Sequence, residues 1–120
     1  MAERDDKVIG FVIYEIHKKR LHILNFAVHE DHQRQGIGEA MASKLLRKLS
    51  HERRTRIMLE VRETNLDAQL FFKTMGFRAV SVLRDFYEED GAEEDAYLMQ
   101  YRYQPSESEL NDPNNRLSIS

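Results

Sequence analysis

The sequence predicts an α/β fold, with a mixed sheet of about five strands and two main helices. Two observations support it: apolar, β-branched runs of strand length recur along the chain, and two stretches between them place apolar residues at helical spacing. The strands are expected at 8–16, 21–28, 56–62, 77–83 and 96–103, and the helices at 37–51 and 66–75. The order β-β-α-β-α-β-β implies a partly parallel sheet with antiparallel pairs at each end.

The first half of the chain holds two strands and a long helix. VIGFVIYEI at 8–16 is nearly continuous in apolar residues, which is typical of a central strand buried on both faces. The charged turn HKKR separates it from LHILNFAV at 21–28, so we expect the two strands to pair antiparallel. From Ile37 to about His51, apolar residues recur with helical spacing, and lysines and arginines occupy the other face.

The second half alternates strands with a short helix. RIMLEVR at 56–62 is the third strand, and the helix over 66–75 is expected to end at Gly76. The acidic run 85–95 carries seven carboxylates and is interpreted as a solvated loop. Residues 104–120 are polar and contain both prolines, which favours a flexible tail.

Composition limits the class of protein. A chain of 120 residues fits one domain with a modest core, placed at residues 1–103. The absence of cysteine excludes disulfides, thiolate metal sites and a cysteine nucleophile, and it fits a reducing compartment. The net charge of −3 favours neither nucleic acid nor membrane as a partner. Since no segment looks like a secretion signal or a membrane span, we expect a cytoplasmic protein.

Two glycines stand where the first helix should begin, in QRQGIG at 33–38. Helix N-termini carry unpaired N–H groups and partial positive charge, so Gly36 and Gly38 would let a phosphate approach the backbone, with Arg34 adding charge. A plain turn is the alternative. A Walker A loop is absent, and a dinucleotide fingerprint would need a small residue where Met41 stands.

The segment ILNFAVHEDHQRQGIGEAM resembles motif A of the GNAT acetyltransferases, Q/R-x-x-G-x-G/A, through Gln33, Gly36 and Gly38. Further segments resemble the RimI-type ribosomal-protein alanine N-acetyltransferases: LEVRETN (59–65), FFKTMGF (71–77), RDFY (84–87) and EEDAYLM (93–99). The resemblance covers roughly residues 8–103. It implies a GNAT-like sheet and acetyl-CoA as the cosubstrate.

The resemblance assigns cofactor contacts residue by residue. The pantetheine arm would pair with the backbone of Phe26, Ala27 and Val28, as a peptide pairs with a strand edge, although their side chains are also plain core residues. Asn65 would contact CoA, or simply cap the second helix. The pyrophosphate contacts fall on Arg34, Gln35, Gly36, Ile37, Gly38 and Glu39, next to Gln33 of the motif.

Glu60 matches the family's proposed general base. It shares a strand face with Met58 and Arg62, opposite three apolar residues. A carboxylate within an apolar strand is costly unless it is paired or useful, and an ion pair with Arg62 is the alternative. An α-amino group has a pKa near ~8, so a carboxylate that takes its proton would help acetyl transfer. Without cysteine, direct attack in a ternary complex is the natural route.

One departure concerns the general acid. The RimI group has a tyrosine four residues before the glycine of its GF pair, and this chain has Phe72 there. Three interpretations stay open. CoA leaves unaided as a thiolate, since thiols have a pKa near ~8.5; Tyr87 or Tyr97, otherwise packing residues, takes the role; or the protein is a weak catalyst.

A second departure is at the start. Family members carry a strand, two helices and another strand before the segment equivalent to 8–16, where this chain has seven residues. The acceptor site would then be more open, completed by a second subunit or supplied by a partner. An exposed sheet edge would also invite dimerisation, so a homodimer is a hypothesis. Arg84 and Tyr87 match the family's substrate-side segment. The five histidines show no convincing ligand spacing, so no metal is expected.

The sequence therefore predicts an acetyl-CoA-dependent N-acetyltransferase. The acceptor is an amine, by resemblance a protein N-terminal α-amine, with a small amine as the other class of acceptor. The alternative is a non-catalytic CoA-binding or protein-interaction module of GNAT fold.

Overall fold

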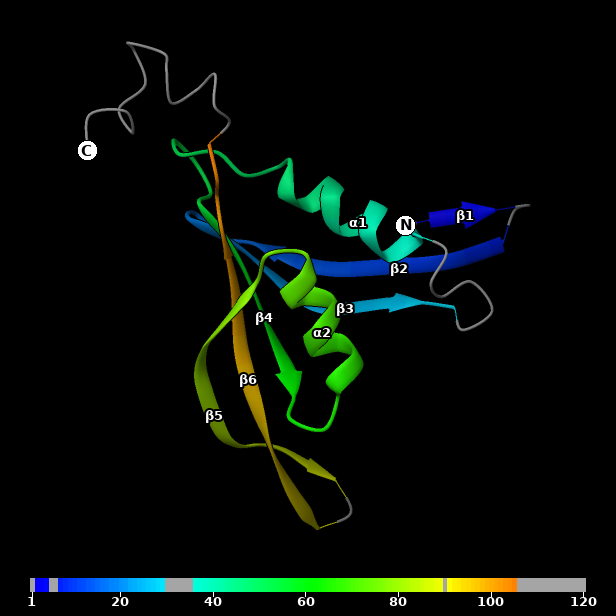
Figure 1. The fold of residues 1–120 in the computed structure, drawn as a ribbon, viewed down its shortest axis with the longest axis vertical. Helices are drawn as coiled ribbons and strands as arrows, with labels where there is room; N and C mark the ends of the chain where they lie inside the picture. The colour runs from blue at the N-terminus through cyan, green and yellow to red at the C-terminus, as the bar shows by residue number, and fades with distance from the viewer. Residues whose placement is uncertain (1, 5–6, 30–35, 90, 106–120) are drawn as a thin grey trace.

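The computed structural model describes residues 2–4, 7–29, 36–89 and 91–105. They form a six-stranded sheet with the strand order β1-β2-β3-β4-β6-β5 and two helices (Figure 1). The elements are β1 (Ala2–Arg4), β2 (Lys7–Ile16), β3 (Arg20–Val28), α1 (Ile37–Leu46), β4 (Arg56–Arg62), α2 (Leu66–Thr74), β5 (Arg78–Glu89) and β6 (Ala92–Arg102). The predicted order is confirmed, and β1 adds a short strand before it.

The sheet is mixed, as predicted. All neighbouring strands pair antiparallel except β3 and β4, which pair in parallel. That parallel register joins 20–22 to 56–58 and goes no further. Beyond it the two strands diverge (Figure 1).

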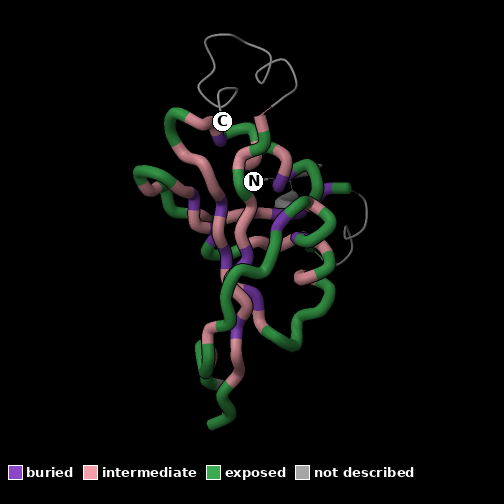
Figure 2. The backbone as a smooth tube through the Cα atoms, turned by 60° about the vertical axis from the view of Figure 1, so that its left-hand side comes forward, coloured by how far each residue is buried: buried purple, intermediate pink, exposed green. Residues whose placement is uncertain are grey.

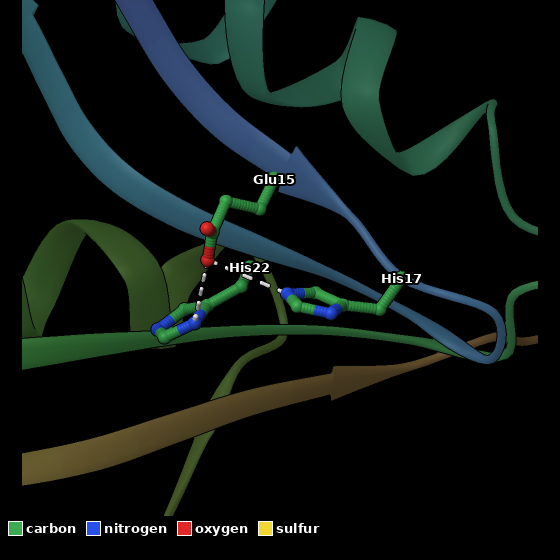
Figure 3. A group of neighbouring side chains, drawn as sticks. All are labelled: Glu15, His17 and His22. Carbon is green, nitrogen blue, oxygen red and sulfur yellow. Dashed lines mark hydrogen bonds and ion pairs between the residues drawn. The ribbon is translucent and has the colours of Figure 1, made fainter.

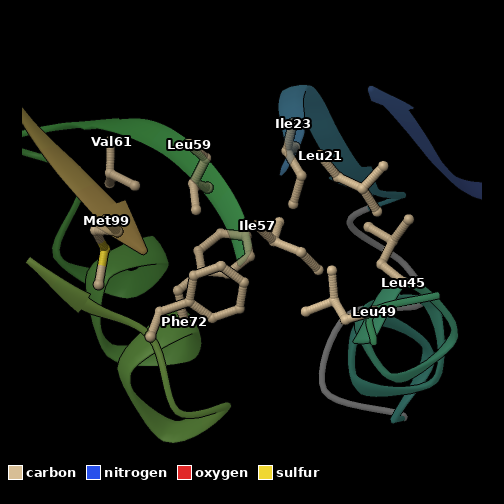
Figure 4. Close-up of a cluster of buried hydrophobic side chains, with 10 residues drawn as sticks. Leu21, Ile23, Leu45, Leu49, Ile57, Leu59, Val61, Phe72 and Met99 are labelled. Atoms are coloured by element: carbon tan, nitrogen blue, oxygen red, sulfur yellow. The ribbon is translucent and has the colours of Figure 1, made fainter. Parts of the chain in front are cut away.

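Both helices cover the same face of the sheet. On β4, Ile57, Leu59 and Val61 are buried, and they pack in one cluster with Leu45 of α1 and Phe72 of α2 (Figure 4). The alternation of RIMLEVR therefore places its apolar half against the helices. Neither helix in the described part of the chain is long and apolar enough to cross a bilayer.

The ends of α2 follow local rules. Asn65 is the N-cap, and its side-chain oxygen accepts a hydrogen bond from Ala68 N at 3.1 Å. At the other end Gly76 takes a left-handed conformation, with φ of 102°. The N–H of Phe77 donates to the carbonyl of Phe72 at 2.9 Å, which completes a Schellman motif. Gly76 therefore ends the helix as predicted.

Three expectations were wrong. The strand over 8–16 is not buried on both faces, because the helices cover one face only, and Ile13 on the uncovered face is 51% exposed. Helix α1 ends at Leu46 rather than near His51, although Leu49 beyond it is still buried.

The acidic run is also not a loop. It forms the distal half of the β5–β6 hairpin, where Tyr87, Glu88 and Glu89 pair with Glu94, Glu93 and Ala92. Cross-strand pairing satisfies its backbone, while most of its described residues are exposed (Figure 2). The tail predicted for 104–120 lies outside the described residues from 106 onward.

Candidate functional site

The sheet is split between β3 and β4. The parallel ladder ends at His22 and Met58, and β3 bulges just beyond it. Ile13 pairs with Asn25 and Tyr14 with Ile23, so Leu24 is an extra residue in β3. Bulges of this kind re-aim a strand and are common next to active sites.

A groove lies on the helix-covered side of this split. It has a volume of about 780 Å³, within the range typical of small-molecule sites. The end of β3, the start of α1 and one side of α2 form its walls. The lining residues are Phe26, Val28, Gly36, Gly38, Glu39, Asp67, Ala68, Leu70, Phe71, Phe72 and Thr74.

The two glycines at the start of α1 serve different purposes. Gly36 is the N-cap with φ of 79°, a conformation that favours glycine, and among the described residues a Cβ there would meet nothing within 4 Å. A Cβ on Gly38 would lie 3.3 Å from the ring of Phe71. Gly36 therefore leaves the helix N-terminus open toward the groove, and Gly38 lets α1 approach α2.

The structure brings part of the predicted cofactor set together. Phe26, Val28, Gly36, Gly38 and Glu39 line the groove. Ala27, Ile37 and Asn65 are not among its lining residues, and the side chain of Ile37 is buried against Ile9 and Met41. Gln33, Arg34 and Gln35 lie outside the described residues.

Sequence reasoning missed the wall formed by α2. Leu70 is 65% exposed in the groove, which is unusual for a leucine on an amphipathic helix. In the sequence, the signal for this wall was the pair of apolar residues Leu66 and Leu70, which lie off the buried face of α2.

Glu60 lies on the face of the sheet that the helices leave uncovered. His22 Nε2 on β3 is 2.7 and 2.9 Å from its two carboxylate oxygens. The two side chains are only 22% and 20% exposed. Arg62, the partner considered from sequence, pairs instead with Glu94 at 3.0 Å. The structure therefore gives Glu60 a histidine partner.

Tyr87 lies beside this pair. Its ring packs under the guanidinium of Arg62, 4.1 Å from ring centroid to Cζ. Burial raises the pKa of Tyr87 above its ordinary value, Arg62 opposes this, and the charges of Glu60 and Glu94 add to it. The phenol therefore keeps its proton at neutral pH, although the raised pKa makes it a weaker acid.

Phe72, Tyr97 and Arg84, which the sequence analysis also singled out, make packing or ion-pair contacts. Phe72 is 4% exposed and packs edge-on against Phe26, Phe71 and Phe77. Tyr97 packs against the same core. Arg84 pairs with Asp95 at 3.1 Å on the exposed hairpin.

Comparison with known proteins identifies the class of this fold and site. Residues 1–77 match the model of the Acetyltransferase (GNAT) family. The chain belongs to that family.

Two curated relatives are similar over most of the chain. The [ribosomal protein bS18]-alanine N-acetyltransferase of Escherichia coli K12 is 30% identical over 96 residues, which cover 80% of this chain and 65% of the relative. The N-alpha-acetyltransferase of Sulfurisphaera tokodaii is 34% identical over 112 residues, covering 82% of this chain and 65% of the relative. The chain thus spans just under two thirds of the length of these relatives.

Solved structures share the fold. The crystal structure of the Escherichia coli ribosomal-protein-S18-alanine N-acetyltransferase superimposes with a TM-score of 0.76 at 28% identity, covering 87% of this chain and 67% of that one. Arabidopsis thaliana NAA60 in complex with acetyl-CoA gives a TM-score of 0.64 at 30% identity, covering 69% of this chain and 48% of that one.

Proposed function

We propose that this chain is an acetyl-CoA-dependent N-acetyltransferase that acetylates an amine, most specifically a protein N-terminal α-amine. The relatives support the acceptor class, since one acetylates a ribosomal-protein alanine by its name and the other is an N-alpha-acetyltransferase. The NAA60 complex supports the cosubstrate.

One observation carries the proposal. The groove and Glu60 lie at the same split in the sheet but on opposite faces. The groove is lined by residues of β3 and both helices, whereas Glu60 contacts His22 on the uncovered face. Glu60 is two residues beyond Met58, the last residue of β4 that pairs with β3. A thioester entering from one face and an amine entering from the other would meet there.

The groove fits acetyl-CoA chemically. Phosphates favour the N-terminus of a helix, where Gly36 leaves open space in front of the first turn of α1. The backbone of Phe26 and Ala27 pairs with β2 on one side and extends past the end of the β3–β4 ladder on the other. That is the kind of strand edge on which the amides of pantetheine would pair.

The reaction needs two proton movements. The neutral amine nitrogen attacks the thioester carbonyl, a C–N bond forms and the C–S bond breaks. Glu60, held by His22, takes the proton that the amine releases. The thiolate of CoA leaves and takes a proton, for which Tyr87 is the candidate donor because Phe72 has none.

The decisive experiment is an acceptor screen with saturating acetyl-CoA. Peptides with free N-terminal alanine or serine are compared with N-terminally blocked lysine peptides and with polyamines, with release of free CoA thiol as the readout. We expect turnover with free N-termini and acetylation of the α-amine by mass spectrometry. Turnover with lysine or polyamine only would overturn the acceptor assignment.

A second candidate function is a non-catalytic CoA-binding module. The observation that favours it is Phe72, fully packed where relatives of the RimI type would have a phenol. Binding of acetyl-CoA with no thiol release from any amine would favour it. A cytoplasmic location and a homodimer, both expected from the sequence, stay predictions; light scattering tests the second.

A further inference from the structure

Three side chains with metal-binding atoms meet on the uncovered face, near the turn between β2 and β3 (Figure 3). Glu15 and His22 are opposite each other in the antiparallel register, so they share a face. His17 follows Glu15 by two residues and points back toward it (Figure 3). Glu15 Oε1 lies 3.4 Å from His17 Nε2 and 3.9 Å from His22 Nδ1.

These distances are close to those of a metal site. Metal-ligand bonds of roughly 2.0–2.1 Å in a tetrahedron place ligand atoms roughly 3.3 Å apart. All three candidate atoms here lie within 4.8 Å of one another. The side chains of Glu15 and His17 are 52% and 40% exposed, so they have room to close the remaining gap.

His22 is the fixed member of the cluster. Its Nε2 lies 2.7 Å from the carboxylate of Glu60, and an ionised carboxylate only accepts hydrogen bonds. Nε2–H therefore donates to Glu60, and Nδ1 lies on the side of the ring that faces Glu15, 3.9 Å from its Oε1. A histidine held in this way by a carboxylate is the usual arrangement behind a metal-bound imidazole.

We propose that Glu15, His17 and His22 bind a zinc ion, and that this ion is coupled through His22 to Glu60. Two imidazoles and one carboxylate suit Zn²⁺, whereas Mg²⁺ and Ca²⁺ prefer sites made of oxygen ligands. Among the described residues, this is the group of histidine and acidic side chains close enough together to hold an ion.

The coupling has a consequence for the proposed acetyl transfer, on which this part rests. Zinc on Nδ1 would draw electrons from the imidazole, so the Nε2–H group would donate more strongly to Glu60. This would hold the carboxylate of Glu60 more firmly in place against His22. Zinc would therefore slow acetyl transfer by restricting the movement of Glu60 and leave the groove on the other face unchanged.

The binding test uses the full chain without a histidine tag. Zinc is titrated by calorimetry, and Co²⁺ is used as a spectroscopic probe of tetrahedral ligation. We expect one ion per chain, at least tenfold weaker in Glu15→Gln and His17→Gln. In Glu60→Gln the affinity should fall roughly tenfold to a hundredfold, the usual effect of losing a carboxylate behind a metal-bound histidine.

A matched pair of controls exists in His51 and Glu52, a histidine and a carboxylate 3.7 Å apart that are not members of the cluster. His51→Gln and Glu52→Gln should bind zinc as the wild type does. A wild type that binds no zinc, or a Glu15→Gln that binds it equally well, would overturn the site.

The activity test separates this proposal from the proposed function. Zinc should lower kcat for the amine, a chelator should restore it, and Glu15→Gln should be insensitive. Should the chain show no acetyl transfer at all, the proposed function fails while the binding results still decide the site. Should Glu60→Gln bind zinc as tightly as the wild type, the coupling is overturned.

Discussion

The two faces of β4 differ in what they contribute. On one, Ile57, Leu59 and Val61 are 0%, 4% and 4% exposed beneath the helices. On the other, Glu60 and Arg62 are partly buried and make polar contacts to His22 and Glu94. The covered face holds the fold together beneath the two helices that line the groove, whereas the uncovered face carries the titratable groups.

This division teaches that binding and chemistry are separable in this protein. A change on the uncovered face should alter the proton-transfer step without altering cofactor binding. A change at the groove should alter cofactor binding without altering the groups that transfer protons. Each of the following predictions would break or sharpen that division.

Glu60→Gln should have the largest effect on turnover. The amide cannot take a proton from the amine, so kcat should fall by roughly 10² to 10⁴. The rise in melting temperature with acetyl-CoA should stay as in the wild type, because the groove lies on the other face. Thiol release and thermal melts measure the two effects. Unchanged kcat would dismiss Glu60 as the base, and Glu52→Gln is the exposed control.

Ile57→Ala should have the largest effect on stability. Its side chain is fully buried between strands and helices, so its loss should cost about 2–5 kcal/mol of unfolding free energy. Met58→Ala, next to it on the uncovered face, should cost about 1 kcal/mol, since less surface is re-exposed. Urea denaturation measures both, and equal losses would mean that the uncovered face is buried in solution.

Gly36→Arg should abolish the thermal shift produced by acetyl-CoA. The side chain would occupy the open space before the first turn of α1, where the pyrophosphate is proposed to lie. Gly91→Arg is a matched control, because Gly91 in the β5–β6 turn has the same φ of 79° and, like Gly36, no described atom within 4 Å of an added Cβ. The backbone strain, roughly 1–2 kcal/mol, is then the same in both variants. An equal thermal shift in both would show that the phosphate site is misplaced.

Glu94→Gln should have the smallest effect, a small loss of stability at neutral pH that disappears in acid. The hydroxyl of Thr64 donates to Glu94, and Arg62 donates at 3.0 Å, so the pKa of Glu94 lies below its ordinary value near 4.5. A depressed carboxyl pKa stabilises the fold above the unfolded value and loses that contribution as pH falls below it. The variant should therefore lose less stability than the wild type on acidification below pH 4.5. Parallel acid titrations followed by circular dichroism measure both losses, and equal losses of stability in the variant and the wild type would contradict this prediction.

Local patterns predicted much of the fold. The alternation in RIMLEVR placed Ile57 and Glu60 on the correct opposite faces, and Gly76 ended α2 as expected. The β-branched run over 8–16 was a strand but was not enclosed, because periodicity within a segment does not reveal how many helix layers cover it.

Other features depend on contacts that are distant in sequence. His22 and Glu60 are 38 residues apart and meet only because the parallel ladder sets their register. The acidic hairpin was missed because carboxylates disfavour strands, and pairing with β6 overrides that preference. Its Asp-Gly dipeptide at 90–91 was the available turn signal.

The three-residue parallel ladder has a consequence for how the chain can be divided. Among the described strands it is the one link between the β1–β2–β3 half and the β4–β6–β5 half of the sheet. The side chains of Leu21, Ile57 and Leu45 hold the halves together (Figure 4). Two fragments, separated within 50–54, should therefore reassemble on mixing, with recovery of acetyl-CoA binding as the signal that the halves have joined.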